Sequence, residues 1–337
     1  MGLRLSPAKT SILSFPGDCP SIAWSCDGLH IQRVPSATYL GLTFHAKHGV
    51  FPICASREQS MWGAWAALQR QYAGLNCGVS LSLLLRVHQA CVPPVASYGC
   101  ELWGLRGMPS RLARARQKLA IGHINMLRQI TGLRKSTPHE IVLLESGGAP
   151  LGHSWLLRSV TFWNNFDTLP PTSLFRRVAL ESVSQAHQGA DNWASSFAKA
   201  LVDIGYPFVL NPASKEVVDP SLVRHLLAER QTTSFVPMPE NSNPRTCPSQ
   251  GVIVCTYARW FQQPTWARNR APLTSLSLLP DTLRLFLRFR SGCSGLPIDT
   301  GRHRRPFPIP RAQRFCAKCA SQSIGDDWGQ DVVSYRG

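Results

Sequence analysis

Hydrophobic and polar residues follow two different patterns along this chain, and the change falls near residue 50. Up to that point the apolar runs are short and separated by turn residues, which is typical of β-strands. The predicted strands are Ser11–Phe15, Ile22–Trp24, Leu29–Ile31 and Tyr39–Leu42. Asp27-Gly28 suits the positive φ angles of a tight hairpin turn, so we interpret Asp27 as a turn residue rather than a metal ligand. One interpretation of Tyr39–Leu42 is a buried strand, with Gly41 allowing close backbone approach.

From about residue 55 to residue 204 the spacing becomes helical. Ser56 and Gln59 have the spacing of a capping box, which predicts a helix start at this point. Behind them, apolar residues recur in steps of four and three and so lie on one helix face. This stripe consists of Met61, Trp65, Leu68, Tyr72 and Leu75. We interpret it as core packing.

Capping residues at helix starts, and proline or glycine at helix ends, predict further helices. Pro109–Thr131 has helical spacing, and Thr137-Pro138-His139-Glu140 starts a short helix that Gly147-Gly148 closes. After Pro170-Pro171, helices are predicted over 172–187 and 191–204, and a short one from Asp219-Pro220 through Leu227. Residues 235–250 are rich in Pro, Asn and Ser and are predicted to be a linker.

The predicted fold is α+β and mostly α. Its expected parts are a β segment at 1–50, a helical domain at 51–234, the linker at 235–250 and a basic, irregular module at 251–337.

The net positive charge of the chain indicates a polyanionic partner. The 337 residues contain 36 Lys and Arg against 19 Asp and Glu, a formal net charge of +17. Such an excess favours nucleic acid through neutralisation of phosphates, although charge that merely maintains solubility is the alternative. The 44% of hydrophobic residues, with ten Trp, argue against wholesale disorder.

The basic side chains gather in two places. In Pro109–Thr131, Leu112, Leu119, Met126 and Ile130 can face inward, while the basic residues near the start of the helix are Arg111, Arg114, Arg116 and Lys118. These four can contact a nucleic-acid backbone or form an ordinary solvated face. The second group is Arg288, Arg290, Arg302, Arg304, Arg305, Arg311 and Arg314. Prolines between them suggest an extended track along phosphates.

Eleven cysteines are scattered without a regular framework, and no segment has the layout of a signal peptide. Val79–Ala96, the most apolar stretch, is interrupted by Arg86, His88 and two prolines, so no membrane span is predicted. We therefore expect reduced thiols and an intracellular protein, nuclear or cytoplasmic and not secreted. Cys316 and Cys319 have the spacing of half a zinc site, and two free thiols are the alternative.

Several landmarks, in their order, resemble a known family. They are Gly2–Phe15, Tyr39-Leu40-Gly41-Leu42, Tyr98-Gly99-Cys100-Glu101-Leu102-Trp103-Gly104 and Cys316-Ala317-Lys318-Cys319. The chain resembles the reverse transcriptases of non-LTR, LINE-like retrotransposons, from the end of the palm through the thumb to the Cys-rich C-terminal region. The resemblance implies a β-hairpin remnant of a polymerase palm followed by a helical, thumb-like bundle.

The resemblance also implies roles for particular residues. Tyr39–Leu42 matches the segment that grips the primer strand, and Lys9 matches a lysine near the incoming nucleotide. The fingers and most of the palm are not matched, and with them the carboxylates that hold the Mg²⁺ ions of a full-length relative. We therefore expect no polymerisation by this chain alone and no cofactor in it. The third and fourth zinc ligands of the family, after Cys319, are not matched either.

Three functional hypotheses remain from the sequence. The first is a reverse transcriptase fragment that retains binding to RNA or DNA. The second is a nucleic-acid-binding module without catalysis, acting alone or with a separately encoded palm. The third is a decayed reading frame without a selected function.

Overall fold

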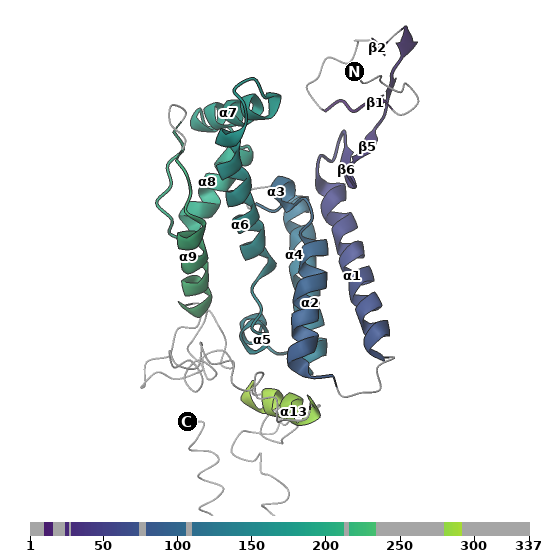
Figure 1. Ribbon diagram of the computed structural model, residues 1–337, viewed down its shortest axis with the longest axis vertical. Coiled ribbons are helices and arrows are strands. Elements are labelled where there is room, and N and C mark those ends of the chain that lie inside the picture. Colours follow the sequence, from purple (N-terminus) through teal and green to yellow (C-terminus); the bar gives the residue numbers. More distant parts are fainter. Residues whose placement is uncertain are drawn as a thin grey trace, which may run out of the picture. The chain divides into compact units, whose positions relative to one another are not determined.

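A computed structural model shows a mostly helical protein with a small β component at its N-terminal end (Figure 1). The structure describes residues 10–15, 24–26, 28–73, 79–105, 110–211, 216–233 and 280–291. The predicted α+β, mostly α fold class is confirmed at this level.

The strands form three two-stranded sheets. The first pairs β1 (Ser11–Ile12) in parallel with β4 (Gln32–Arg33). The second pairs β2 (Ser25–Cys26) with β3 (Leu29–His30), and the third pairs β5 (Ser36–Tyr39) with β6 (Leu42–His45), both antiparallel. Cys26 pairs with Leu29 and Gly28 has a φ of +75°, which confirms the predicted hairpin turn.

The structure contradicts the interpretation of Tyr39–Leu42 as a buried strand. Tyr39 pairs directly with Leu42, so Leu40 and Gly41 form a two-residue turn with φ angles of +49° and +73°. The side chains of Tyr39 and Leu40 are 69% and 71% exposed. Glycine at position 41 allows the positive φ of the turn. It is not needed for close packing, because the nearest atom to an added Cβ would be 4.0 Å away.

Eleven helices are described. Their bounds are α1 Phe51–Ala73, α2 Leu81–Ala96, α3 Cys100–Trp103, α4 Ser110–Thr131, α5 His139–Ser146, α6 Leu151–Asn164, the 3-10 helix η2 Asn165–Thr168, α7 Leu174–His187, α8 Trp193–Asp203, α9 Pro220–Thr233 and α13 Pro280–Arg290. Helices α4, α5, α7 and α8 confirm the predicted ones to within about two residues, and α9 runs six residues past the predicted end.

Two helix predictions need correction. Helix α1 begins at Phe51, so Ser56 lies inside it and donates to the carbonyl of Ile53 instead of capping. Pro52 in the first turn costs no internal hydrogen bond and fits this earlier start. In the module expected to be irregular, residues 280–290 form α13, because Leu283 and Leu287 are four residues apart and both buried.

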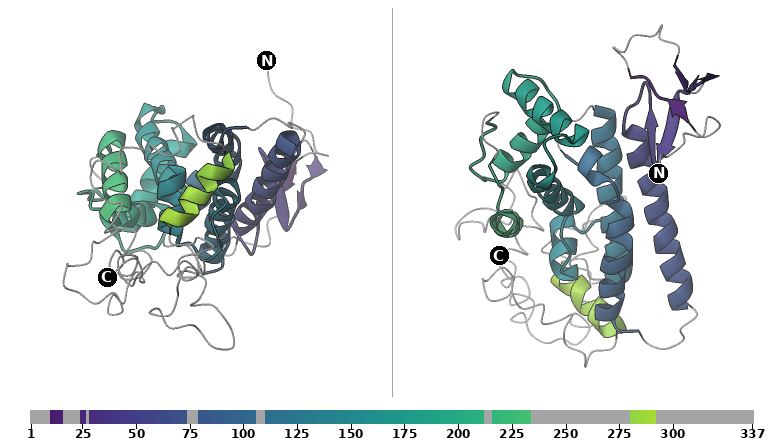
Figure 2. Two further views of the ribbon diagram at one scale, coloured as in Figure 1. Left: turned by 90° about the horizontal axis from the view of Figure 1, so that it is seen from below. Right: turned by 45° about the horizontal axis from the view of Figure 1, so that its top comes forward.

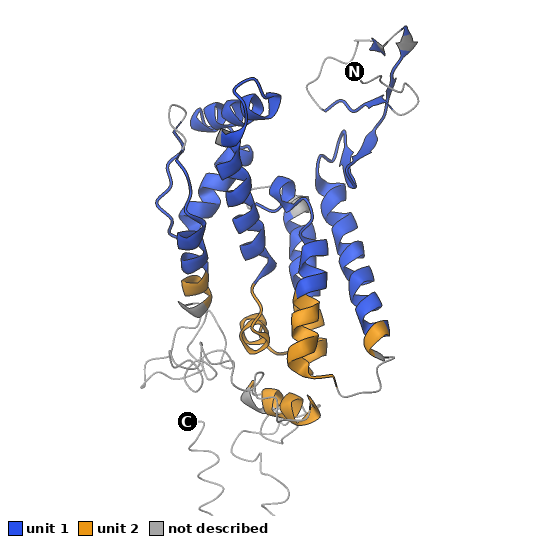
Figure 3. Ribbon diagram, in the orientation of Figure 1, with its two compact units in different colours: residues 1–70, 90–123, 150–227 blue, residues 71–89, 124–149, 228–337 orange. Residues whose placement is uncertain are grey.

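The chain divides into two compact units, coloured in Figure 3. Unit 1 consists of residues 1–70, 90–123 and 150–227, and unit 2 of residues 71–89, 124–149 and 228–337. These edges do not coincide with the predicted boundaries at 50, 234 and 250, which stay predictions.

An aromatic core holds the C-terminal half of unit 1 together. Trp163 stacks on Phe197 with ring centroids 5.0 Å apart, and Phe197 stacks on Trp193 at 5.3 Å. Helices α6 and α8 supply these rings and contact each other, and α7 packs against α8 (Figure 2). Large buried aromatic rings supply much of the apolar area of a core, so this cluster anchors the fold of unit 1.

Unit 2 is tied together by side chains that bond the ends of helices. Gly147, just after α5, has a φ of +63° and donates back to Leu143 and Leu144. Its carbonyl accepts from Gln89, and the carbonyl of Gly148 accepts from Gln231. Helix C-termini carry unsatisfied carbonyls, which these side chains satisfy.

No helix among the described residues combines the length and the apolar character that crossing a membrane requires.

Candidate nucleic-acid interface

The turn between β5 and β6 is fixed to the helices of unit 1 by two side chains. The Tyr98 hydroxyl donates to the Leu40 carbonyl over 2.8 Å, and Arg57 Nη2 donates to the Gly41 carbonyl over 3.3 Å. The Arg57 guanidinium also lies over the Tyr98 ring, 5.3 Å from its centroid, within cation–π range. We call Tyr39, Leu40 and Gly41 the hairpin tip. Two of the segments singled out in the sequence, the hairpin tip and Tyr98–Gly104, are thus in contact.

Gly99 explains why Tyr98 stands at the hairpin. Its φ is +71°, which L side chains rarely adopt, and an added Cβ would lie 2.8 Å from Leu42 Cδ2. The missing side chain therefore lets β6 approach the start of α3 closely. A residue with a Cβ would push Leu42, and with it the hairpin, away from Tyr98.

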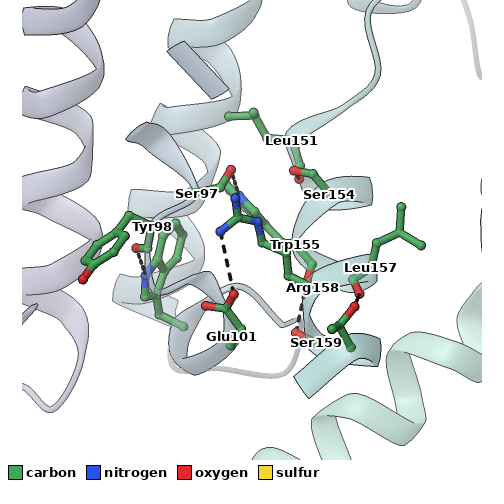
Figure 4. Close-up of polar contacts among 11 residues, drawn as sticks. Ser97, Tyr98, Glu101, Leu151, Ser154, Trp155, Leu157, Arg158 and Ser159 are labelled. Atoms are coloured by element: carbon green, nitrogen blue, oxygen red, sulfur yellow. Dashed lines mark hydrogen bonds and ion pairs between the residues drawn. The ribbon is translucent and has the colours of Figure 1, made fainter. Parts of the chain in front are cut away.

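The rest of the Tyr98–Gly104 landmark packs against α6 (Figure 4). Trp155 Nε1 donates to Ser97 Oγ over 3.0 Å, and Trp103 Nε1 donates to the Tyr98 carbonyl over 3.4 Å. The two indoles meet edge to face with centroids 5.0 Å apart. An added Cβ on Gly104 would lie 3.0 Å from Trp155 Cβ, so glycine allows this packing. The landmark is therefore a scaffold that positions Tyr98.

A polar contact completes the same junction. Arg158 Nη1 lies 3.8 Å from Glu101 Oε1, and both side chains are partly exposed (Figure 4). Exposed pairs of this kind contribute little to stability. The Glu101 carbonyl accepts from Trp193 Nε1 at 2.6 Å, which links α3 to the aromatic core.

The hairpin tip combines exposure with backbone strain. Leu40 is the non-glycine residue with a positive φ among the described residues, and a left-handed backbone costs an L residue about 1–2 kcal/mol. Strain that the surrounding structure holds in place is a feature of binding sites. The exposed Tyr39 ring beside it offers a flat apolar face.

The basic residues of α4 do not share one environment. Arg114 and Lys118, four residues apart, are both exposed and lie on one face of the helix. Arg116 is half-buried and donates to the carbonyls of Gly104 and Leu105, so it holds the preceding loop. We call Arg114 and Lys118 the basic stripe. The side chain of Arg111 is outside the described residues.

Arg288 also has a different environment from the one expected. Its Nε donates to the Gly132 carbonyl over 2.6 Å, and Arg284 Nε donates to the Ile130 carbonyl over 3.3 Å. These carbonyls lie at the C-terminal end of α4, where positive charge is favourable. Arg288 therefore closes a helix end within unit 2.

The remaining predicted site residues lie outside the described residues. They are Lys9, Arg302, Arg304, Arg305, Arg311, Arg314, Cys316 and Cys319, together with the side chain of Arg290. Within the described part of the chain, no three His, Cys, Asp or Glu side chains are grouped to hold a metal ion.

Three buried groups have shifted pKa values. Burial raises the pKa of the Cys54 and Cys100 thiols to about 12, so neither is a nucleophile at neutral pH. Burial lowers the pKa of His123 to about 4, so this residue of α4 is neutral. None of the three therefore brings charge to the basic stripe.

Sequence reasoning missed Arg57 and the contact role of Tyr98. Arg57 lies one residue from the predicted cap Ser56, and nothing in its spacing connects it with Gly41, sixteen residues earlier. The signal for Tyr98 was the glycine that follows it, since glycine is the residue for a positive φ.

Comparisons with models of protein families, with curated protein sequences and with solved structures find no match for this chain.

Proposed function

We propose that this protein is the thumb-like, nucleic-acid-binding part of a reverse-transcriptase-related protein. RNA and DNA are the proposed ligands, and the proposal assigns the chain a binding role without a catalytic step. The observation that carries it is the basic stripe. Arg114 and Lys118 project from a helix, residues 110–131, that contains no acidic residue. Phosphates are the ligands that such a face binds.

The hairpin tip supports the same proposal from a second direction. The tip offers an exposed tyrosine and backbone held by Arg57 and Tyr98, all in unit 1 with the basic stripe. A guanidinium and flat rings near one another are the side chains that bind unpaired bases and phosphates. In the resemblance, this segment contacts the primer strand.

The experiment measures binding of the full chain to a labelled RNA–DNA hybrid by fluorescence anisotropy over a range of salt. Replacing Arg114 and Lys118 by alanine is expected to weaken binding and to reduce the slope of log K against log salt by about 2. The matched control replaces Arg134 and Lys135, an exposed pair of the same composition, by alanine. The control removes the same net charge.

Two outcomes contradict the proposal. Equal losses in the variant and the control indicate non-specific attraction to a basic protein. Absence of binding by the unaltered chain removes the proposed function and favours a decayed reading frame.

A further inference from the structure

We propose that the indole of Trp62 is a stacking platform for an unpaired base of single-stranded RNA or DNA. This inference rests on the proposed nucleic-acid function and adds a residue and a ligand form to it. Trp62 lies on α1, in the part of unit 1 that contacts α4.

The contact between α1 and α4 holds the indole in place. An ideal Cβ on Gly122 would lie 2.7 Å from Met61 Cε and 3.5 Å from Trp62 Cζ2. The indole thus lies in van der Waals range of this position of α4, next to the flexible end of Met61. One edge of the indole is thereby covered by the backbone of α4, which fixes the ring without burying it.

The other side of the ring is open to solvent. Trp62 is 37% exposed, whereas Trp65 in the next turn belongs to the buried stripe and is 8% exposed. On the C-terminal side of Trp62 the neighbours along α1 are small, because Gly63 and Ala66 follow it, while Glu58 and Gln59 precede it by one turn. An added Cβ on Gly63 would meet no atom within 4 Å. A flat base therefore has room to lie on the indole.

The charges beside the ring suit a phosphate backbone. Lys118 lies one helical turn before Gly122 on the same face of α4, and Arg114 lies one turn before Lys118. Helix α1 itself carries Arg57 and Arg70 and one acidic residue, Glu58, one turn before Trp62. Aromatic rings combined with cations bind single strands with little sequence preference.

The test compares full-length variants on a labelled single-stranded oligonucleotide, as RNA and as DNA, and on a blunt RNA–DNA hybrid. Trp62→Ala is expected to weaken binding to the single strands by about 5- to 150-fold and to leave hybrid binding nearly unchanged. Trp62→Phe keeps an aromatic face and is expected to retain most of the affinity. Trp24→Ala, at another exposed tryptophan, is the matched control and is expected to have no effect.

Thermal melting of each variant distinguishes loss of stacking from loss of the fold. If Trp62→Ala is unstable, the affinity of Trp62→Phe is compared with that of the unaltered chain. Equal affinity of Trp62→Ala and the unaltered chain for single strands overturns the platform. An equal loss on the hybrid, or an equal loss in Trp62→Phe, also overturns it. If hybrid binding still depends on the basic stripe, the proposed function survives. If the unaltered chain binds neither ligand, both proposals fail.

Discussion

The hydroxyl of Tyr98 donates to the carbonyl of Leu40 across 2.8 Å, although the two residues are 58 positions apart in the sequence. The bond joins a hairpin of two short strands to a helical body. Isolated two-stranded hairpins are marginally stable in water, so the order of the hairpin tip depends on this anchor.

Removing the hydroxyl tests that dependence. Tyr98→Phe keeps the ring under Arg57 but loses the hydrogen bond, which contributes about 1 kcal/mol. We expect faster amide hydrogen exchange in β5 and β6 and little change in the core helices. Tyr39→Phe removes the same group from the exposed tyrosine of the tip and is expected to leave exchange unchanged. Equal exchange in the two variants would show that Tyr98 does not anchor the hairpin.

The strain at Leu40 gives a second prediction. Asparagine tolerates the left-handed backbone that leucine resists, so Leu40→Asn is expected to stabilise the hairpin by about 1 kcal/mol. If the exposed leucine takes part in binding, the same change weakens affinity for the RNA–DNA hybrid. Hydrogen exchange and anisotropy measure the two effects separately. A gain in hairpin protection with unchanged affinity would assign the tip no binding role.

Gly99 is expected to tolerate no side chain. Gly99→Ala combines a φ of +71° with an approach of 2.8 Å to Leu42, so we predict a loss of about 1–3 kcal/mol in the free energy of unfolding. Gly189→Ala is the control, since Gly189 also has a positive φ, of +94°, but open space around it. Urea denaturation measures both. A loss at Gly99 no greater than that at Gly189 would leave backbone strain as the whole effect.

Arg288 is predicted to matter for stability. Arg288→Ala removes the bond to the Gly132 carbonyl at the end of α4, and hydrogen bonds from charged groups contribute about 1.5–3 kcal/mol. We expect a lower melting temperature with an unchanged salt dependence of nucleic-acid binding. Arg224→Ala removes an exposed arginine of α9 and is expected to change neither. A reduced salt slope in Arg288→Ala with unchanged melting would restore the role predicted from sequence.

Stability is expected to fall as the pH is lowered from about 6.5 to about 4. Burial lowers the pKa of His123 to about 4, so in this window the unfolded chain binds a proton that folded His123 does not. Each pH unit then removes about 1.4 kcal/mol. Burial, with the charge of Arg128, lowers the pKa of His139 and adds a change of the same sign.

The measurement for His123 is urea unfolding at several pH values. His123→Gln is expected to flatten the dependence. The same slope in His123→Gln and the unaltered chain would assign the pH dependence to other groups.

Local signals in the sequence predicted much of this fold. The stripe of Met61, Trp65 and Leu68 is buried as expected, and the glycine pair after residue 146 ends α5. These features depend on neighbours within one or two turns. The amphipathic spacing of Leu283 and Leu287 was also readable, but prolines and arginines around it favoured an extended interpretation.

The candidate site was less predictable, because its contacts join distant residues. Arg114 and Arg116 are two positions apart on one helix, yet one is exposed and the other bonds backbone carbonyls. Which of them faces solvent depends on where Gly104 and Leu105 lie, and no local pattern carries that information. The same holds for Arg57 and Gly41.

The bonds from Arg284 and Arg288 to the C-terminal end of α4 affect the order in which the protein folds during synthesis. Arg284 bonds the carbonyl of Ile130, which left the ribosome 154 residues earlier. At 5–20 residues per second this delay is roughly 8 to 30 seconds. During that time Arg284 is not yet present to donate to the Ile130 carbonyl, which water then solvates. The nascent chain is therefore expected to complete unit 2 late, because residues of α13, near the C-terminal end of the sequence, bond the end of α4 in its first half.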